Sequence, residues 1–369
     1  GEWPLRDEVR IYIRNDVAPL LWDYGVGATA VDSTITDPYA EGELQLSVAD
    51  VIGAGELLMP RNAAAGPDGR LYVADSGNHR VVVYDGTEAV LSFGEFGVDA
   101  GQFNEPWGIA ADEEFIYVAD TWNHRVQKFT LEGEFVTSFG VSGVADSAQA
   151  NPGFFFGPRA LALLSNNQIA VTDTGNHRIQ IFDRDGNFVL AAGGIGTVLG
   201  QFYEPVGLAA SLSDEDGALF VADTWNQRVQ ELNADINFLP VNEWPVSAWL
   251  SQSIDNKPYL ALDTAGRLYL TDPEGYRVLV FGRDGTYIGR FGQFGQDATS
   301  FDRPTGITVD AEGNVYVVDT GNGRVVKYVA PFGTTAVETQ EDPAPPTDTD
   351  NIASPETDTE TETDAEPTP

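Results

Sequence analysis

The sequence predicts an all-β fold in which six blades, each of four antiparallel strands, form a closed ring: a six-bladed β-propeller. Three observations lead to this prediction. A short motif recurs six times, turn signals separate short apolar runs within each recurrence, and no segment keeps the 3.6-residue apolar period of an amphipathic helix for three turns. Four short strands repeated every 40 to 50 residues or so are typical of a propeller blade rather than of an open solenoid.

The recurring motif contains an aspartate followed, five residues later, by an arginine. Its first three copies read VADSGNHRV, VADTWNHRV and VTDTGNHRI, and successive arginines lie 45, 53, 50, 49 and 47 residues apart. A group repeated in every blade serves the blade rather than one active site, so we expect each arginine to contact its aspartate and nearby backbone carbonyls. The six predicted structural pairs are Asp75 and Arg80, Asp120 and Arg125, Asp173 and Arg178, Asp223 and Arg228, Asp272 and Arg277, and Asp319 and Arg324.

Four strands, a to d, follow one another in each unit. A proline opens strand a, a turn with glycine leads to strand b, the motif forms the b–c loop, and a tight turn such as Asp85-Gly86 joins strands c and d. Units four and five depart from this order. Residues 233–235 lack the glycine of the c–d turn, and residues 273–276 replace the usual b–c loop. We therefore expect the ring to be irregular near blades four and five.

The sixth unit ends after its third strand, near Tyr328, so the ring needs a strand from elsewhere in the chain. Residues 43–48 alternate polar and apolar like a strand d. We predict that this N-terminal strand completes the C-terminal blade and hides two sheet edges. The predicted domains are an N-terminal extension (1–42), the propeller (43–333) and an acidic low-complexity tail rich in Thr and Pro (334–369).

The motif, Asp followed by Thr or Ser and then Asn-His-Arg-Val, resembles the NHL repeat over about residues 60–327. The resemblance implies blades around a central channel with the motif in the b–c loop. Some NHL propellers are lyases that bind zinc through channel histidines. The three histidines here, His79, His124 and His177, occupy the same repeat position, so we expect a structural role for them and no metal site.

Composition limits the possible partners. The chain has 57 acidic and 20 basic residues, with a formal net charge of −37. This charge repels phosphate backbones, so we predict no nucleic-acid partner. No apolar run reaches the roughly 18 residues of a membrane helix, so no membrane span is predicted within the chain. The absence of cysteine excludes disulfides, thiolate metal ligands and a cysteine nucleophile.

The two ends of the chain indicate a surface location. Residues 334–369 repeat Thr, Asp, Glu and Pro, the composition of a disordered spacer or of an O-glycosylated stalk, and both readings stay open. Residues 3–14 resemble the segment that follows the last membrane span in bacterial glycosyltransferase-like membrane proteins with a C-terminal NHL propeller. The chain begins at Gly1 without a signal peptide. We expect a processed fragment of a longer precursor, extracellular or on a bacterial cell surface.

Residues that break the repeat symmetry are the candidates for ligand binding. Two tryptophans replace the glycine usual in the b–c loop, and other aromatic residues lie beside the start of strand a or in the altered loop of blade five. Such residues suit stacking on sugar rings or gripping a peptide, the alternative being packing between blades. The candidates are Trp107, Trp122, Tyr203, Trp225 and Tyr276.

No catalytic constellation emerges from the sequence, and no cofactor is predicted. The leading hypothesis is therefore an extracytoplasmic binding or scaffold domain for a protein, peptide or glycan, able to join a cell-surface assembly. A calcium-dependent hydrolase or lactonase-like enzyme is the first alternative. Asp112, Asp263 and Asp310 follow strand a in three blades and could bind calcium, but their repetition favours a role in turns. The second alternative is an accessory domain of a membrane glycosyltransferase. Propellers host unrelated functions, so the fold alone does not decide.

Overall fold

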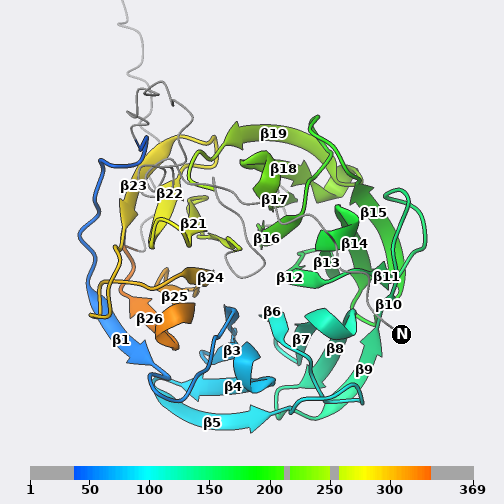
Figure 1. The fold of residues 1–369 in the computed structure, drawn as a ribbon, viewed down its shortest axis with the longest axis horizontal. Coiled ribbons are helices and arrows are strands. Elements are labelled where there is room, and N and C mark those ends of the chain that lie inside the picture. Colours follow the sequence, from blue (N-terminus) through cyan, green and yellow to red (C-terminus); the bar gives the residue numbers. More distant parts are fainter. Residues whose placement is uncertain (1–36, 212–216, 250–256, 334–369) are drawn as a thin grey trace, which may run out of the picture. The chain divides into compact units, whose positions relative to one another are not determined.

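The computed structural model describes residues 37–211, 217–249 and 257–333. Six four-stranded antiparallel sheets surround a central channel, which confirms the predicted six-bladed propeller (Figure 1). The predicted tail and most of the predicted N-terminal extension lie outside the described residues. No helix within the described ranges is long and apolar enough to cross a membrane.

Each blade runs from an inner strand a to an outer strand d. Blade 1 is β2 (Asn62–Ala65), β3 (Leu71–Asp75), β4 (Arg80–Asp85) and β5 (Glu88–Phe93). Blade 2 is β6 (Pro106–Ala111), β7 (Phe115–Asp120), β8 (Arg125–Thr130) and β9 (Phe135–Phe139). Blade 3 is β12 (Pro158–Leu163), β13 (Gln168–Asp173), β14 (Arg178–Asp183) and β15 (Phe188–Gly193).

The second half of the ring follows the same order. Blade 4 is β16 (Pro205–Ala210), β17 (Ala218–Asp223), β18 (Arg228–Asn233) and β19 (Leu239–Pro245). Blade 5 is β20 (Leu260–Leu262), β21 (Leu268–Asp272), β22 (Arg277–Phe281) and β23 (Tyr287–Phe291). Blade 6 is β24 (Pro304–Val309), β25 (Val315–Asp319), β26 (Arg324–Tyr328) and the N-terminal β1 (Val48–Ile52).

Short elements fill the connections. Single 3₁₀ turns form the b–c loops of five blades: η2 (Ser76–Asn78), η3 (Thr121–Asn123), η4 (Thr174–Asn176), η5 (Thr224–Asn226) and η7 (Thr320–Asn322). The 3₁₀ turn η6 (Ala234–Ile236) stands in the c–d turn of blade 4 that lacks glycine. A parallel pair, β10 (Val141–Ser142) and β11 (Phe154–Phe155), lies in the connection from blade 2 to blade 3.

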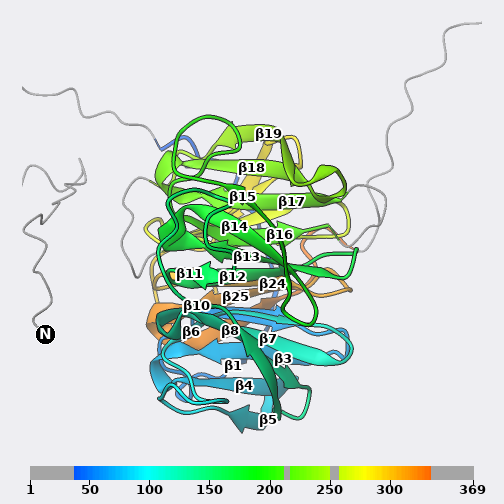
Figure 2. The same cartoon turned by 90° about the vertical axis from the view of Figure 1, so that its right-hand side faces the viewer.

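The core lies between the blades, because each sheet is covered on both sides by its neighbours. Strands b and c are therefore buried nearly throughout, whereas the outer strand β19 alternates exposed residues with half-buried or buried ones. At four of the six junctions between blades, a phenylalanine just before strand a is fully buried. These phenylalanines are at positions 103, 155, 202 and 301. Seen edge-on, the strands run from one face of the ring to the other (Figure 2).

Glycine lets the inner strands approach closely around the channel. A Cβ at Gly108 would lie 2.6 Å from the Arg159 carbonyl oxygen, and one at Gly306 would lie 2.5 Å from the Asn62 Cα. A Cβ at Gly207 would meet the Tyr259 Cα at 2.7 Å. These distances are shorter than side-chain contacts allow, so only glycine fits at the third position of strand a in blades 2, 4 and 6.

An N-terminal strand closes the ring, as predicted, but its position in the sequence was predicted wrongly. Strand β1 pairs antiparallel with β26, with Val51 opposite Val326, so the strand starts at Val48 and not at residue 43. Glu43 makes one isolated bridge to Arg290 and residues 44–47 form no ladder, so the alternation that suggested a strand has another cause. Leu44 and Leu46 turn towards the core cluster that includes blades 5 and 6.

Residues 37–42, which we assigned to the extension, pack on blade 5. Tyr39 is 7% exposed and its ring lies 5.7 Å from that of Phe281. Asp37 accepts a hydrogen bond from Arg277 at 3.0 Å. These residues of the predicted extension therefore contact the propeller.

Candidate functional site

The repeated Asp–Arg pairs hold each b–c loop to the connection that precedes its blade. In blade 2, Arg125 Nε lies 2.8 Å from Asp120 Oδ2, and its Nη2 donates to the carbonyls of Asp99 and Gln102 at 2.7 and 2.8 Å. The backbone N–H of Asn104 donates to the same aspartate at 2.7 Å. The six Nε–Oδ2 distances are all 2.7 or 2.8 Å, at Asp75, Asp120, Asp173, Asp223, Asp272 and Asp319.

In four of the blades, the rest of the motif joins the blade to the next. The hydroxyl after the aspartate donates to the carbonyl of the proline that opens the following strand a, as from Thr121 to Pro158 at 2.8 Å and from Thr174 to Pro205 at 2.8 Å. Equivalent bonds run from Ser76 to Pro106 and from Thr320 to Pro60. The residue type at this motif position thus follows from a contact between blades.

The three histidines serve the same junctions and stand apart from one another. Each occupies a left-handed backbone position, and its Nδ1 accepts a backbone N–H of the next connection. The bonds are 3.1 Å from Glu105 to His79, 3.0 Å from Gly157 to His124 and 3.0 Å from Glu204 to His177. Burial lowers the pKa of His124 and of His177.

The junction between blades 4 and 5 departs from this pattern. Thr224 donates to the carbonyl of Glu204, in the connection that precedes its own blade, at 2.7 Å. The Glu204 carboxylate accepts from Trp225 Nε1 at 2.7 Å and from Lys257 Nζ at 3.0 Å. Burial opposes ionisation of Glu204, but Lys257, Trp225 and Arg159 together outweigh it and the pKa is lowered. Burial, with the charge of Arg159, lowers the pKa of Lys257 to about 8.

A cationic and aromatic cluster lies beside this junction, on the residues that follow the prolines of strand a. The guanidinium carbons of Arg61 and Arg159 lie 4.5 and 4.2 Å from the Trp107 ring centre. Tyr259 reaches from blade 5 to donate to the Arg159 carbonyl of blade 3 at 2.8 Å. These side chains are at most 6% exposed, so the cluster is buried among the inner strands.

The five predicted aromatic residues fall into different settings. Trp107 is 1% exposed and belongs to the buried cluster, whereas the other four are half-buried at the face that carries the b–c loops. Tyr203 and Trp225 lie together, with ring centres 6.1 Å apart. Tyr276 instead contacts Phe294 at 4.8 Å, in blade 5. The structure therefore brings two of the five together on one part of the face.

Sequence reasoning missed the most exposed apolar residues on this face. They lie on the connections from strand d to the next strand a, which we call the connectors: residues 94–105, 140–157, 193–204 and 292–303. Phe96 and Phe294 are each 67% exposed and Ile195 is 61% exposed. The signal was present in the sequence as Phe-Gly-x-Phe-Gly in two connectors and as an isoleucine between two glycines in a third.

Each connector is a closed and hydrogen-bonded loop. In the first, Phe103 N donates to Glu95 O at 2.8 Å and Gly97 N donates to Phe103 O at 3.1 Å, a parallel bridge between residues 96 and 103. The same bridge joins residues 195 and 202 and residues 294 and 301. A buried phenylalanine anchors every bridge, so the exposed residue opposite it is held in place.

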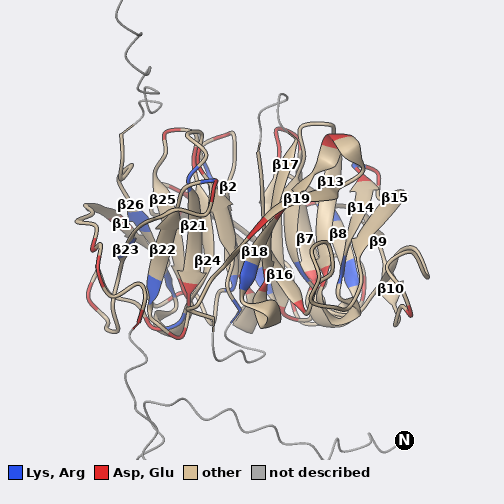
Figure 3. Ribbon diagram, turned by 90° about the horizontal axis from the view of Figure 1, so that it is seen from above, with Lys and Arg blue, Asp and Glu red and all other residues tan. Residues whose placement is uncertain are grey.

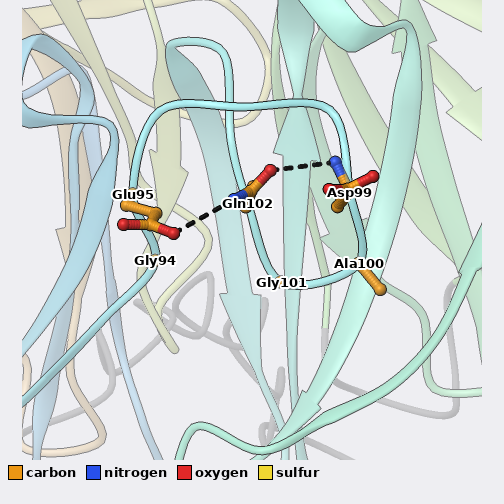
Figure 4. A pocket seen from close by; sticks show the side chains of 6 residues that line it. All are labelled: Gly94, Glu95, Asp99, Ala100, Gly101 and Gln102. Carbon is orange, nitrogen blue, oxygen red and sulfur yellow. Dashed lines mark hydrogen bonds between the residues drawn. The ribbon is translucent and has the colours of Figure 1, made fainter.

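A shallow hollow lies inside the first connector. It has a volume of about 320 Å³ and is lined by residues 94, 95 and 99–102 (Figure 4). Gln102 crosses it, donating to Glu95 at 3.0 Å and accepting from the Asp99 N–H at 3.1 Å. The hollow is thus braced by the loop's own polar groups. Among the described residues no three His, Cys, Asp or Glu side chains are grouped to hold a metal ion.

Comparison with known proteins identifies the repeat. Residues 57–84, 103–129, 155–182 and 301–328 match the NHL repeat. Protein brain tumor of Drosophila melanogaster is 43% identical over 99 residues, covering 26% of this chain and 9% of that protein. A probable peptidyl-alpha-hydroxyglycine alpha-amidating lyase of Caenorhabditis elegans is 32% identical over 143 residues, covering 37% of this chain and 40% of that protein.

The chain spans less than half the length of these curated relatives. A solved gluconolactonase from Xanthomonas campestris shares the fold, with a TM-score of 0.56 at 14% identity, over 79% of this chain and 99% of that one. The matched segments lie in blades 1, 2, 3 and 6, and the same Asp–Arg ion pair recurs in the other two. The chain is therefore a six-bladed β-propeller that carries NHL repeats.

Proposed function

We propose that this propeller is a binding domain whose protein partner docks on the face that carries the connectors and the b–c loops. The observation that carries the proposal is the exposure of Phe96, Ile195 and Phe294 on hydrogen-bonded loops at equivalent positions of three connectors. Exposed apolar side chains gathered on one face are a mark of protein–protein contact. NHL propellers generally mediate protein interactions, which agrees with this role.

The half-buried aromatic residues extend the same face towards the channel. Trp122 donates from Nε1 to Glu105 at 3.1 Å, and Trp225 donates to Glu204 at 2.7 Å. Both indoles thus have one edge fixed by a carboxylate and part of the ring open to solvent. Tryptophan and tyrosine held in this way are frequent energetic centres of interfaces.

We further propose that the domain acts outside the cytoplasm, with the tail as a stalk or spacer. The composition of residues 334–369 and the strongly acidic chain support this location. Intact mass spectrometry of the native protein tests it. Sugar increments above the 39.8 kDa chain are expected, and a mass without them in protein isolated from the cytoplasm would contradict the proposal.

Capture from an extract of the source cells tests the docking face. The double variant Phe96→Ser and Phe294→Ser removes two exposed rings, and Val90→Ser with Ile288→Ser is the matched control on outer strands β5 and β23, where the side chains are 46% and 38% exposed. The wild-type chain and the control should retain the same specific partner, and the connector variant should lose it. Equal capture by all three chains would place the partner elsewhere.

A further inference from the structure

The connectors combine apolar exposure with negative charge, and this combination says what kind of partner fits. More than half of the large apolar side chains exposed among the described residues lie on the connectors or on the chain just before blade 1. On the connectors the exposed fractions reach 71% at Val98 and 63% at Val198. A monomeric protein seldom gathers such residues on one face without a partner for them.

Carboxylates alternate with these apolar residues along the chain. Glu95 precedes Phe96, Asp99 follows Val98, and Asp297 lies three residues after Phe294. Across the four connectors the only basic residue is Arg303, which already lies 3.5 Å from Asp302. Acidic residues also lie on the loops at both ends of the blades (Figure 3), so the surface around the connectors adds to the negative field.

Exposed phenylalanine rings beside carboxylates are suited to cations in two ways. A carboxylate pairs with an ammonium or guanidinium group, and the face of a phenylalanine ring attracts the same group through its quadrupole. The Phe96 ring is fixed against His79, with ring centres 4.9 Å apart, and the Phe294 ring is fixed against Tyr276 at 4.8 Å. Because the rings are already positioned, little ordering of this surface opposes binding.

We propose that the connector face binds a segment of another protein in which lysine or arginine residues alternate with apolar residues. The proposal rests on the docking face proposed above and adds the chemistry of the partner. The apolar residues of the segment pack against Phe96, Val98 and their counterparts in other blades, while its cations reach the carboxylates beside them. The same negative field disfavours an acidic segment, a nucleic acid or an anionic membrane.

Synthetic peptides test the partner's charge separately from the docking face. The probes are peptides of alternating leucine and lysine, with matched peptides of leucine and glutamate and of serine and lysine. Fluorescence anisotropy measures their binding to the full chain. The leucine–lysine peptide should bind at least about ten-fold more tightly than either control, and raising the salt from about 0.05 to about 0.5 M should weaken it.

Two variants locate the effect on the connectors. Asp99→Asn, Asp146→Asn and Asp297→Asn together remove three exposed carboxylates and should weaken the leucine–lysine peptide about ten-fold, as expected for three exposed ion pairs. Phe96→Ser with Phe294→Ser should weaken it about thirty-fold or more. Asp185→Asn with Glu132→Asn, on c–d turns at the other end of the blades, should leave the binding unchanged.

The outcomes separate the two proposals. One outcome keeps the docking face and refutes the cationic partner. In it, the Phe variant loses the captured partner, but neither salt nor the three Asn substitutions change the binding of that partner. If the leucine–glutamate peptide or a vesicle of phosphatidylserine binds as tightly as the leucine–lysine peptide, the charge argument is also overturned. If the Phe variant retains the partner, the docking face itself is refuted.

Discussion

The arginines of the repeat provide a matched pair for measuring what the motif contributes to stability. Arg178 is 0% exposed, and besides Asp173 it contacts the carbonyls of Ala148, Ala150, Asn151 and Phe154. Arg80 is 32% exposed and, besides Asp75, contacts only the Glu56 carbonyl among the hydrogen bonds resolved. The same substitution therefore removes different amounts of bonding in blades 3 and 1.

Arg178→Gln should lower the free energy of unfolding by about 3–5 kcal/mol, because it removes the charged partner of the buried Asp173 carboxylate and leaves several carbonyls without their donor. Arg80→Gln should cost about 1.5–2 kcal/mol, since water reaches the site and replaces part of the bonding. The Arg80 variant thus serves as the control within one chain.

Urea denaturation followed by tryptophan fluorescence measures both variants, with the transition midpoints compared at equal slope. The account requires a clearly larger shift for Arg178→Gln. Equal shifts, or a larger shift for Arg80→Gln, would show that the carbonyl contacts of Arg178 add nothing and would refute the reasoning.

Three further predictions concern junctions and closure. Burial lowers the pKa of His124 and His177 in the folded chain, so the unfolded chain binds more protons below about pH 6.5. The free energy of unfolding should therefore be full above that pH and fall towards pH 5. In urea titrations, His124→Gln and His177→Gln should reduce this dependence on pH. Glu204→Gln leaves Lys257 buried without its carboxylate and should lower the free energy of unfolding by about 3 kcal/mol. Adding Lys257→Met should restore most of that free energy. If this double-mutant cycle shows no recovery, the two side chains are not coupled. Deleting residues 1–52 removes β1, exposes the edge of β26 and should yield soluble aggregates by light scattering, whereas a monomeric product of unchanged melting temperature would contradict the closure.

Much of the fold could be predicted because the same pattern of motif and proline occurs six times in the sequence. The Asp–Arg spacing, the proline before strand a and the turn glycines all mark the same blade boundaries. The start of the closing strand was misplaced, because Leu44 and Leu46 alternate for packing against neighbouring blades and not for pairing. Periodicity of two residues marks a half-buried extended chain, and it does not say whether that chain has a partner strand.

The candidate site was predictable only in part, since its residues come from distant parts of the chain. Trp107 looked like a surface residue until Arg61 and Arg159, from the neighbouring blades, were seen to enclose it. The contact between Tyr259 and the Arg159 carbonyl spans blades 3 and 5, which no local pattern encodes. The connectors were recognised as links between blades, but the exposure of residues 96, 195 and 294, each bridged to a buried phenylalanine, was not predicted.

Hydrogen–deuterium exchange on the propeller with and without its captured partner tests the docking face most directly. The account predicts that bound partner slows exchange in residues 94–105, 193–204 and 292–303, while the outer strands β5, β19 and β23 exchange as in the free protein. Slowed exchange confined to the outer strands or to the c–d turns, with the connectors unchanged, would contradict it.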